Sequence, residues 1–402
     1  GSLGGNSWAY DINNAGQVVG MSYTANWRQR AFLWANGMMQ DLGTLGGSIS
    51  YAYGINDSGQ VVGEAVVDDD AEIVRAFLWQ NGAMQSLGTF AGGQSVAYGI
   101  NNNAQVVGDY SNSLNQNTYA FTWQDGSYQD LGLSFGKANA VNNKAQVVGE
   151  STEAFLWQDG SFQFLGTLGS GLRSIAYDIN DAGQVVGMSY IQAQGTASHA
   201  FLWEKNQLKD LNTLVPAGSG WELREAHGIN KKGQIVGYGV INGQTHAYLL
   251  TPNLPVLIVP GIAGTYAGST TFDRTWLTHR GVHPDDLQVD PLAHVYDDLI
   301  QTLKNVGYEE GKSLFVVKYD WRLSPGPVSP SGPFDGHIAG LNAPALSDDQ
   351  FLYGVDYLGY SLRKASEAYR TTYGGELPAV NIISHSTGGL VARTYIQSGA
   401  YG

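Results

Sequence analysis

Six copies of a four-residue motif constrain the fold of this chain more than any other feature of its sequence. The motif is Gln-Val-Val-Gly in five copies and Gln-Ile-Val-Gly in the sixth. The copies begin at Gln17, Gln60, Gln105, Gln146, Gln184 and Gln234, so their spacings are 43, 45, 41, 38 and 50 residues. A second motif, Ala-Phe-Leu-Trp or a variant, follows each copy and begins at Ala31, Ala76, Ala120, Ala154, Ala200 and Ala247. Internal repeats with a period of about 20–50 residues are typical of solenoids and propellers.

Each repeat predicts about four short strands joined by tight turns. In the first repeat these strands are residues 9–13, 17–23, 30–34 and 38–42, and Asn36-Gly37 predicts a two-residue hairpin between the last two. Glycine supplies 54 of the 402 residues and adopts the positive φ that such turns need. Four strands in about 43 residues match one blade of a β-propeller. A single blade cannot bury its apolar face, so we expect neighbouring blades to stack.

The repeat count predicts an all-β, six-bladed β-propeller over residues 1–252. The segment Gly1-Ser2-Leu3-Gly4-Gly5 resembles the end of the first repeat, Gly43-Thr44-Leu45-Gly46-Gly47. The last repeat lacks this tail. We therefore expect the two ends of the domain to share one blade and close the ring, with an open solenoid as the alternative.

Two patterns in the repeats have both a structural and a functional interpretation. The tryptophans of the second motif favour packing between blades, with stacking platforms for sugars as the alternative. The turn beginning Asp11-Ile12-Asn13-Asn14 could be taken for a calcium loop, but it lacks the dense alternation of oxygen ligands in such loops. Asn side chains that bond to their own turn explain it better.

The repeats resemble the HAF family of predicted extracellular bacterial proteins, named for a recurrent His/Arg-Ala-Phe segment. The residues that carry the resemblance are His199-Ala200-Phe201, Arg30-Ala31-Phe32 and Arg75-Ala76-Phe77. The resemblance implies an extracellular, secreted protein and no defined chemistry. Carbohydrate, a cell surface or another protein are then the candidate partners of the propeller.

Composition excludes several classes of function. The chain has 21 Lys+Arg against 35 Asp+Glu, a net charge of −14, which disfavours nucleic-acid binding because phosphate contacts need basic residues. No apolar run reaches the roughly 18 residues of a transmembrane segment. The absence of cysteine excludes disulfides, thiolate metal sites and a cysteine nucleophile. The histidines have no partners at metal-ligand spacing, so we expect neither a metal nor a cofactor.

The sequence changes character near residue 252, and residues 253–402 predict a partial α/β domain. The continuous apolar run 254–259, followed by Pro260-Gly261, is typical of a strand buried in a parallel sheet. Helical spacing at 292–306 and 350–372 alternates with strand patterns at 313–319 and 379–383, and a further helix follows Gly388. Such alternation predicts a parallel sheet with crossover helices.

Ser386 is the candidate nucleophile of this second domain. The segment Ser384-His385-Ser386-Thr387-Gly388 lies between a predicted strand and a predicted helix, the context of a G-x-S-x-G nucleophile elbow, with Ser384 in place of the first glycine. Such a turn strains the serine backbone and exposes its hydroxyl. The backbone N–H groups of Thr387 and Ile262 are the expected oxyanion-hole donors.

Three segments in order resemble the lecithin:cholesterol acyltransferase-like branch of the α/β hydrolases, which includes bacterial lipases. They are residues 255–264, 319–323 and 384–393. The resemblance implies acyl-ester chemistry on lipid-like substrates, with Ser386 as nucleophile. Tyr319, Asp320, Trp321 and Arg322 are candidates for substrate binding. The alternative, which we favour, is a structural Asp320–Arg322 pair with Trp321 packed near the site.

Two hypotheses about function follow. The first is an extracellular serine esterase, lipase or acyltransferase whose propeller binds substrate, surface or partner. The second is a non-catalytic binding or assembly protein in which the propeller is the working part. The acid and the histidine follow the nucleophile in α/β hydrolases, but the sixteen residues after Ser386 contain no Asp, Glu or His. Either the natural chain continues past Gly402 to an Asp and a His, as the first hypothesis predicts, or the chain is a truncated or partly built form. From residues 1–402 alone we expect little turnover.

Overall fold

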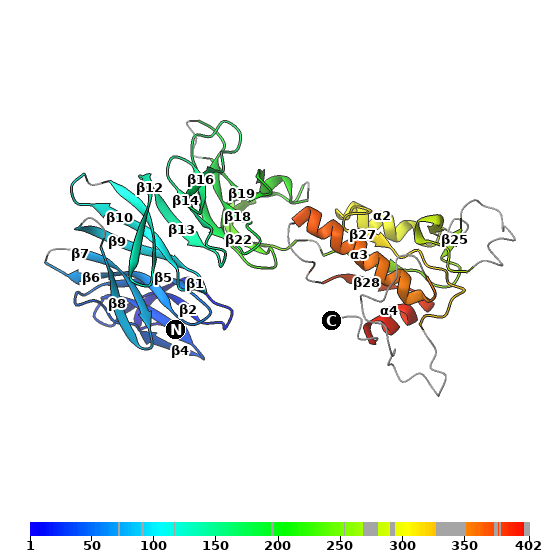
Figure 1. Ribbon diagram of the computed structural model, residues 1–402, viewed down its shortest axis with the longest axis horizontal. Coiled ribbons are helices and arrows are strands. Elements are labelled where there is room, and N and C mark those ends of the chain that lie inside the picture. The colour runs from blue at the N-terminus through cyan, green and yellow to red at the C-terminus, as the bar shows by residue number, and fades with distance from the viewer. Residues whose placement is uncertain are drawn as a thin grey trace. The chain divides into compact units, whose positions relative to one another are not determined.

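A computed structural model describes most of the chain in two compact units, Gly1–Thr251 and Pro252–Gly402 (Figure 1). The described residues are 1–70, 73–89, 92–115, 117–193, 197–216, 218–252, 254–267, 280–289, 294–326, 351–373, 377 and 379–397. Each unit is described by itself.

The first unit is a six-bladed β-propeller built from six consecutive antiparallel sheets, coloured blue to green in Figure 1. Five blades have four strands in sequence order, and the sixth has three. The first three blades are β1 (Gly4–Ile12), β2 (Val18–Thr24), β3 (Gln29–Ala35), β4 (Met38–Asp41); β5 (Ser50–Ile55), β6 (Val61–Asp68), β7 (Ile73–Gln80), β8 (Ala83–Gly88); and β9 (Gly92–Ile100), β10 (Val106–Asn112), β11 (Thr118–Gln124), β12 (Ser127–Ser134). The others are β13 (Lys137–Val141), β14 (Val147–Glu150), β15 (Ala154–Gln158), β16 (Ser161–Phe164); β17 (Ser174–Ile179), β18 (Val185–Tyr190), β19 (Ser198–Glu204), β20 (Gln207–Asp210); and β21 (Trp221–Ile229), β22 (Ile235–Ile241), β23 (Gln244–Leu250), with the 3₁₀ helix η1 (Leu211–Thr213).

The two valines of each repeat motif join neighbouring blades. Successive side chains of a strand point to opposite faces, so one valine faces the preceding blade and the other faces the next. Val62 of the second blade packs with Val106 of the third, and Val107 packs with Val147 of the fourth; all four are fully buried. The tryptophans Trp79, Trp157 and Trp203 belong to inter-blade clusters of this kind, so these three are core as expected, and Trp123 packs partly buried against another such cluster.

The asparagine of each turn connects one blade to the next. Asn101 shows the arrangement: its Oδ1 accepts from the N–H groups of Asn103 (3.0 Å) and Gln105 (2.9 Å). Its Nδ2 donates to the backbone oxygen of Asn142, the equivalent residue of the next blade, at 2.9 Å. The same bond to the next blade is made by Asn13, Asn56, Asn142 and Asn180. The expected Asx turn is confirmed, and the same side chain also ties the blades together.

The expected sharing of one blade by the two ends of the unit is wrong. Gly4 opens β1, which pairs with β2 from Gly4 to Ile12, so the N-terminal segment is used in the first blade. Among the described residues, β23 pairs with β22 alone. One face of the sixth blade is open: Val236 is 48% and Leu249 61% exposed, whereas the equivalent Val62 of the second blade is fully buried.

The second unit contains a three-stranded parallel sheet in the order β27-β24-β28. Its strands are β24 (Val256–Val259), β27 (Leu314–Val316) and β28 (Asn381–Ser384), and its helices are α2 (Asp297–Asn305), α3 (Gly354–Tyr373) and α4 (Thr387–Gln397). A short antiparallel pair, β25 (Thr265–Ala267) and β26 (Leu287–Val289), and the 3₁₀ helix η2 (Pro284–Asp286) complete the described elements. The predicted alternation of parallel strands and helices is confirmed, with somewhat different ends.

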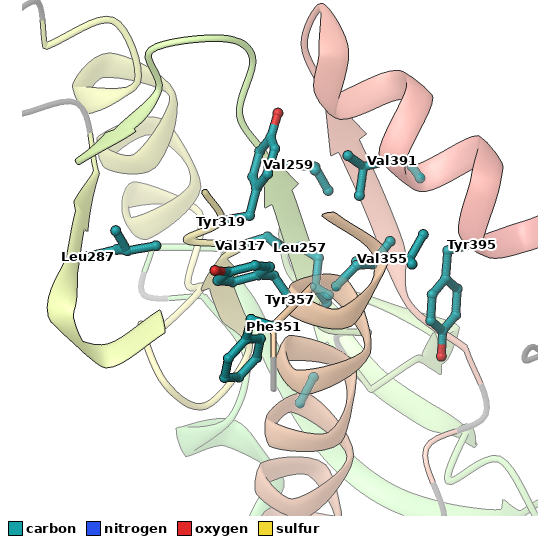
Figure 2. Packing of buried hydrophobic residues seen from close by; sticks show 13 residues of the cluster. Leu257, Val259, Leu287, Val317, Tyr319, Phe351, Val355, Tyr357, Val391 and Tyr395 are labelled. Atoms are coloured by element: carbon teal, nitrogen blue, oxygen red, sulfur yellow. The ribbon is translucent and has the colours of Figure 1, made fainter. Parts of the chain in front are cut away.

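Helices cover both faces of β24, which explains its continuous apolar sequence. Leu257 and Val259 pack with Val355 of α3 and Val391 of α4 (Figure 2). Their neighbours Val256 and Ile258 point the other way, into a cluster that includes Leu299, Ile300 and Leu303 of α2. All four strand residues are at most 3% exposed, so a polar side chain at any position of β24 would be buried.

Two aspartates at equivalent repeat positions make the propeller sensitive to pH. Asp178 accepts from Ile229 N of the next blade at 2.8 Å, and Asp11 accepts in the same way from Ile55 N at 2.8 Å. Burial raises the pKa of Asp178 to about 7 and that of Asp11 to about 6, although these backbone donors act in the opposite direction. Both carboxyl groups are therefore more easily protonated in the folded protein than in the unfolded chain, where the pKa is about 3.9.

We expect Asp178→Asn to flatten the pH dependence of stability. Because the folded pKa is raised, the stabilisation from protonated Asp178 is complete below about pH 4 and is lost as pH rises through about 7. Asparagine keeps an acceptor for Ile229 and carries no charge, so the variant should gain stability relative to the wild type as pH rises. Urea unfolding between pH 4 and 8, followed by tryptophan fluorescence, measures this. Asp125→Asn, in an exposed hairpin, is the control; parallel curves for wild type and Asp178→Asn would contradict the prediction.

Candidate active site in residues 252–402

Ser386 occupies a strained turn between a strand and a helix. It follows the end of β28 at Ser384 and directly precedes α4, and its backbone φ is 54°. A serine in this left-handed region costs on the order of 1–3 kcal/mol. The turn is held by His385 N, which donates to Val259 O at 3.0 Å, and by Gly388 N, which donates to His385 O at 2.9 Å. The Ser386 side chain is exposed, so the strain presents the hydroxyl to solvent.

Two glycines allow the backbone to pass close to Ser386. A Cβ at Gly388 would lie 2.2 Å from the backbone oxygen of Val259, because α4 starts directly over the end of β24. A Cβ at Gly261 would lie 2.8 Å from the Cβ of Ser386. The loop after β24 and the elbow after β28 therefore meet at the candidate nucleophile.

The two expected oxyanion donors lie on these two segments. Thr387 is the first residue of α4, so its N–H has no partner within the helix and lies at the positive end of the helix dipole. Ile262 is 60% exposed and lies in a tight turn closed by Gly264 N donating to Gly261 O at 3.1 Å. The oxyanion role of both N–H groups stays a prediction.

Tyr296 is part of this site and was not identified from the sequence. Its buried hydroxyl accepts from Gly261 N at 2.9 Å and lies 3.1 Å from Nδ1 of His385. It thus fixes the loop after β24 against the elbow and engages one nitrogen of His385. No local signal could have revealed it, because 89 residues separate Tyr296 from His385.

The segment Tyr319–Arg322 divides into one residue at the elbow and three that hold the structure together. The Tyr319 hydroxyl donates to Pro260 O at 2.9 Å and lies 3.1 Å from Oγ1 of Thr387. Asp320 is fully buried and accepts from Arg322 Nε at 2.6 Å. Trp321 Nε1 donates to Thr265 O at 2.9 Å. A buried ion pair fits the structural alternative better than direct substrate binding.

Within the described part of the chain, no group of three or more His, Cys, Asp or Glu is placed to hold a metal ion. None of the helices formed by those residues has the length and apolarity that a membrane span requires.

We expect Tyr296→Phe to destabilise the second unit by about 1–3 kcal/mol, because the buried N–H of Gly261 loses its acceptor. Tyr360→Phe is the matched control, since the Tyr360 hydroxyl makes an exposed bond of 3.2 Å to Asp285. Differential scanning calorimetry of both variants measures the effect. Equal melting temperatures for the two variants would show that the Tyr296 bond contributes little.

Comparison with known families gives two partial matches. Residues 94–253 match a family described as "Protein of unknown function (DUF3466)". Residues 266–329 match the lecithin:cholesterol acyltransferase family; this range contains Tyr319–Arg322 and ends before Ser386. Each match covers less than half of the chain. No curated protein matches the sequence, and the HAF resemblance stays an interpretation of the three quoted segments.

The chain is similar to several solved structures at low sequence identity. The β-propeller domain of the trilobed protease from Pyrococcus furiosus is 8% identical, with 61% of this chain and 82% of that chain covered and a TM-score of 0.42. TolB from Acinetobacter baumannii is 8% identical, with 58% of this chain and 61% of that chain covered and a TM-score of 0.39. A puromycin-hydrolyzing peptidase from Mycobacterium tuberculosis is 13% identical, with 98% of this chain and 67% of that chain covered and a TM-score of 0.38. This chain thus spans less than two thirds of the TolB chain.

Proposed function

We propose that residues 252–402 form the nucleophile-bearing part of an α/β-hydrolase domain, and that Ser386 attacks carboxylic esters of lipid-like substrates. The observation that carries this proposal is the backbone of Ser386, with φ of 54° and an exposed side chain between β28 and α4. A protein keeps such strain at a serine when the position of the hydroxyl matters. The family match at residues 266–329 supports the ester and acyl-transfer class.

The proposed reaction has two steps. The Ser386 oxygen attacks the ester carbonyl carbon while a general base takes the hydroxyl proton, and the N–H groups of Thr387 and Ile262 stabilise the oxyanion. The alcohol leaves, and water or an acyl acceptor then releases the acyl group from Ser386. His385 is unsuited as the base, because it adjoins Ser386 in the elbow itself and cannot swing round to it.

The propeller is proposed as the binding module of an extracellular protein. Repeated sheets packed on one another offer a rigid surface for a ligand, a cell surface or a partner. The propeller fold and the HAF resemblance support this role. If Ser386 proves inert in the native protein, the enzyme hypothesis fails, and the second hypothesis, a non-catalytic binding protein, takes its place.

An alkyl fluorophosphonate tests the nucleophile directly. Fluorophosphonates react with activated serines, so the native protein should gain one adduct, which peptide mass spectrometry should place on Ser386. Ser386→Ala should remain unlabelled. No adduct on the native protein, or an adduct on another residue, would refute the assignment.

A further inference from the structure

Each of the six blades carries a β-bulge at the same position of its innermost strand. The register shifts lie between Ala9/Asp11, Ala52/Gly54, Ala97/Gly99, Ala138/Ala140, Ala176/Asp178 and Ala226/Gly228. The residues left unpaired, called the bulge residues here, are Tyr10, Tyr53, Tyr98, Asn139, Tyr177 and His227. Bulges re-aim side chains and are over-represented beside functional sites.

The bulge residues of the first three blades bring their rings together. Tyr10 and Tyr53 have ring centroids 5.5 Å apart, and Tyr53 and Tyr98 have centroids 5.6 Å apart. Tyr51, two residues before Tyr53, stacks on it with centroids 6.0 Å apart. Four tyrosine rings from three blades therefore form one cluster, which we call the tyrosine cage, and Tyr10 is 46% exposed at its edge.

A carboxylate is bonded to this cage. Glu64 of β6 accepts from the Tyr53 hydroxyl at 2.7 Å. Burial raises the pKa of all four cage tyrosines, and the charge of Glu64 acts in the same direction. Burial raises the pKa of Glu64 itself, although the bond from Tyr53 and the charge of Lys137 act in the opposite direction. The position directly after the repeat motif is Met21, Glu64, Asp109, Glu150, Met188 and Tyr238 in the six blades. The fold does not require an acid at this position, because three of the six repeats have Met or Tyr there.

One ammonium group already lies on the cage. Nζ of Lys137, from the fourth blade, is 3.8 Å from the ring centroid of Tyr98. Its charge lowers the pKa of both Glu64 and Asp109, while burial raises that of Asp109 to about 7. Within the described residues, Lys137 thus acts on both carboxylates, and the cation–ring contact found on the cage is the one at Tyr98.

We propose that the tyrosine cage binds an organic ammonium ion, with Glu64 as its counter-ion. Aromatic rings beside a carboxylate are the chemistry that recognises alkylated ammonium groups, because the ring faces attract the cation and the methyl groups pack on them. The inference concerns the propeller and is independent of Ser386.

Isothermal titration of the protein with choline and with n-butylammonium tests the proposal. Both cations should bind, and 3,3-dimethyl-1-butanol, the neutral isostere of choline, should bind at least about tenfold more weakly. Tighter binding of choline would indicate a quaternary ligand, and tighter binding of n-butylammonium a primary amine such as a lysine side chain. Absence of binding by both cations at about 10 mM, or equal binding of the neutral isostere, would overturn the proposal, as would binding of neutral sugars alone.

Variants separate the cage from general electrostatics. Glu64→Gln and Tyr10→Leu should each weaken binding about tenfold or more, whereas Asp159→Asn, which removes an equal charge from an exposed hairpin, should not. Lys137→Met removes the resident ammonium and should tighten binding. Circular dichroism confirms that each variant is folded. If Asp159→Asn and Glu64→Gln weaken binding equally, the net charge and not the cage is responsible, and the proposal fails.

Discussion

Replacement of Ser386 by alanine is expected to lower ester hydrolysis by the native protein on the order of 10³–10⁶-fold, since the attacking oxygen is lost. The variant should fold normally, because the Ser386 side chain is exposed and contributes no core packing. Any residual rate should come from the oxyanion donors, which remain in place. Hydrolysis of p-nitrophenyl esters of increasing chain length measures kcat/KM, and its trend with length reports the preference for lipid-like acyl groups.

A second serine provides the control for this experiment. Ser366 lies on α3, which packs against the sheet and is not part of the elbow. Ser366→Ala should leave kcat/KM within about twofold of the wild type. If Ser386→Ala hydrolyses esters as fast as Ser366→Ala, Ser386 is not the nucleophile.

Replacement of Gly108 by alanine is expected to have the largest effect on the stability of the propeller. Gly108 ends the third repeat motif and faces the bulge, where a Cβ would lie 1.9 Å from the backbone oxygen of Val96. Neither atom can move without opening the sheet between β9 and β10, so we expect a loss of about 3 kcal/mol or more. Urea unfolding followed by tryptophan fluorescence measures it, since eight of the ten tryptophans lie in residues 1–251.

Gly228 offers a matched control in the sixth blade. A Cβ there would lie 3.3 Å from a methyl group of Val236, a side chain that is 48% exposed and free to shift. Gly228→Ala should therefore cost less than about 1 kcal/mol. Similar losses for the two variants would show that the clash at the bulge does not explain the glycine of the repeat motif.

Local patterns predicted those features that depend on neighbours in the sequence. The repeat period and the Asn-Gly and Asp-Gly hairpins predicted the blades, and the apolar run 254–259 predicted a strand buried on both faces. The elbow around Ser386 was also predictable, because a strand, a tight turn and a helix follow one another within a few residues. The structure gives Ser386 the positive φ that this arrangement requires.

Contacts between distant segments were not predictable in this way. The tail Gly1–Gly5 resembled the end of a repeat, yet Gly4 pairs with Thr24 and enters the first blade. Tyr296 reaches His385 across 89 residues. The bulges leave no clear trace in the sequence, because an inserted residue in a strand still looks like strand.

The sequence by itself determined that this chain has a repeated β unit followed by a parallel α/β unit with Ser386 at its elbow, because periodicity and turn chemistry act over a few residues. Only the tertiary structure decided which faces of the blades are open, which groups surround the elbow, and how tyrosines of three blades gather beside Glu64. These features arise when side chains from separate repeats are brought to one place, and their distances depend on the packing of whole sheets.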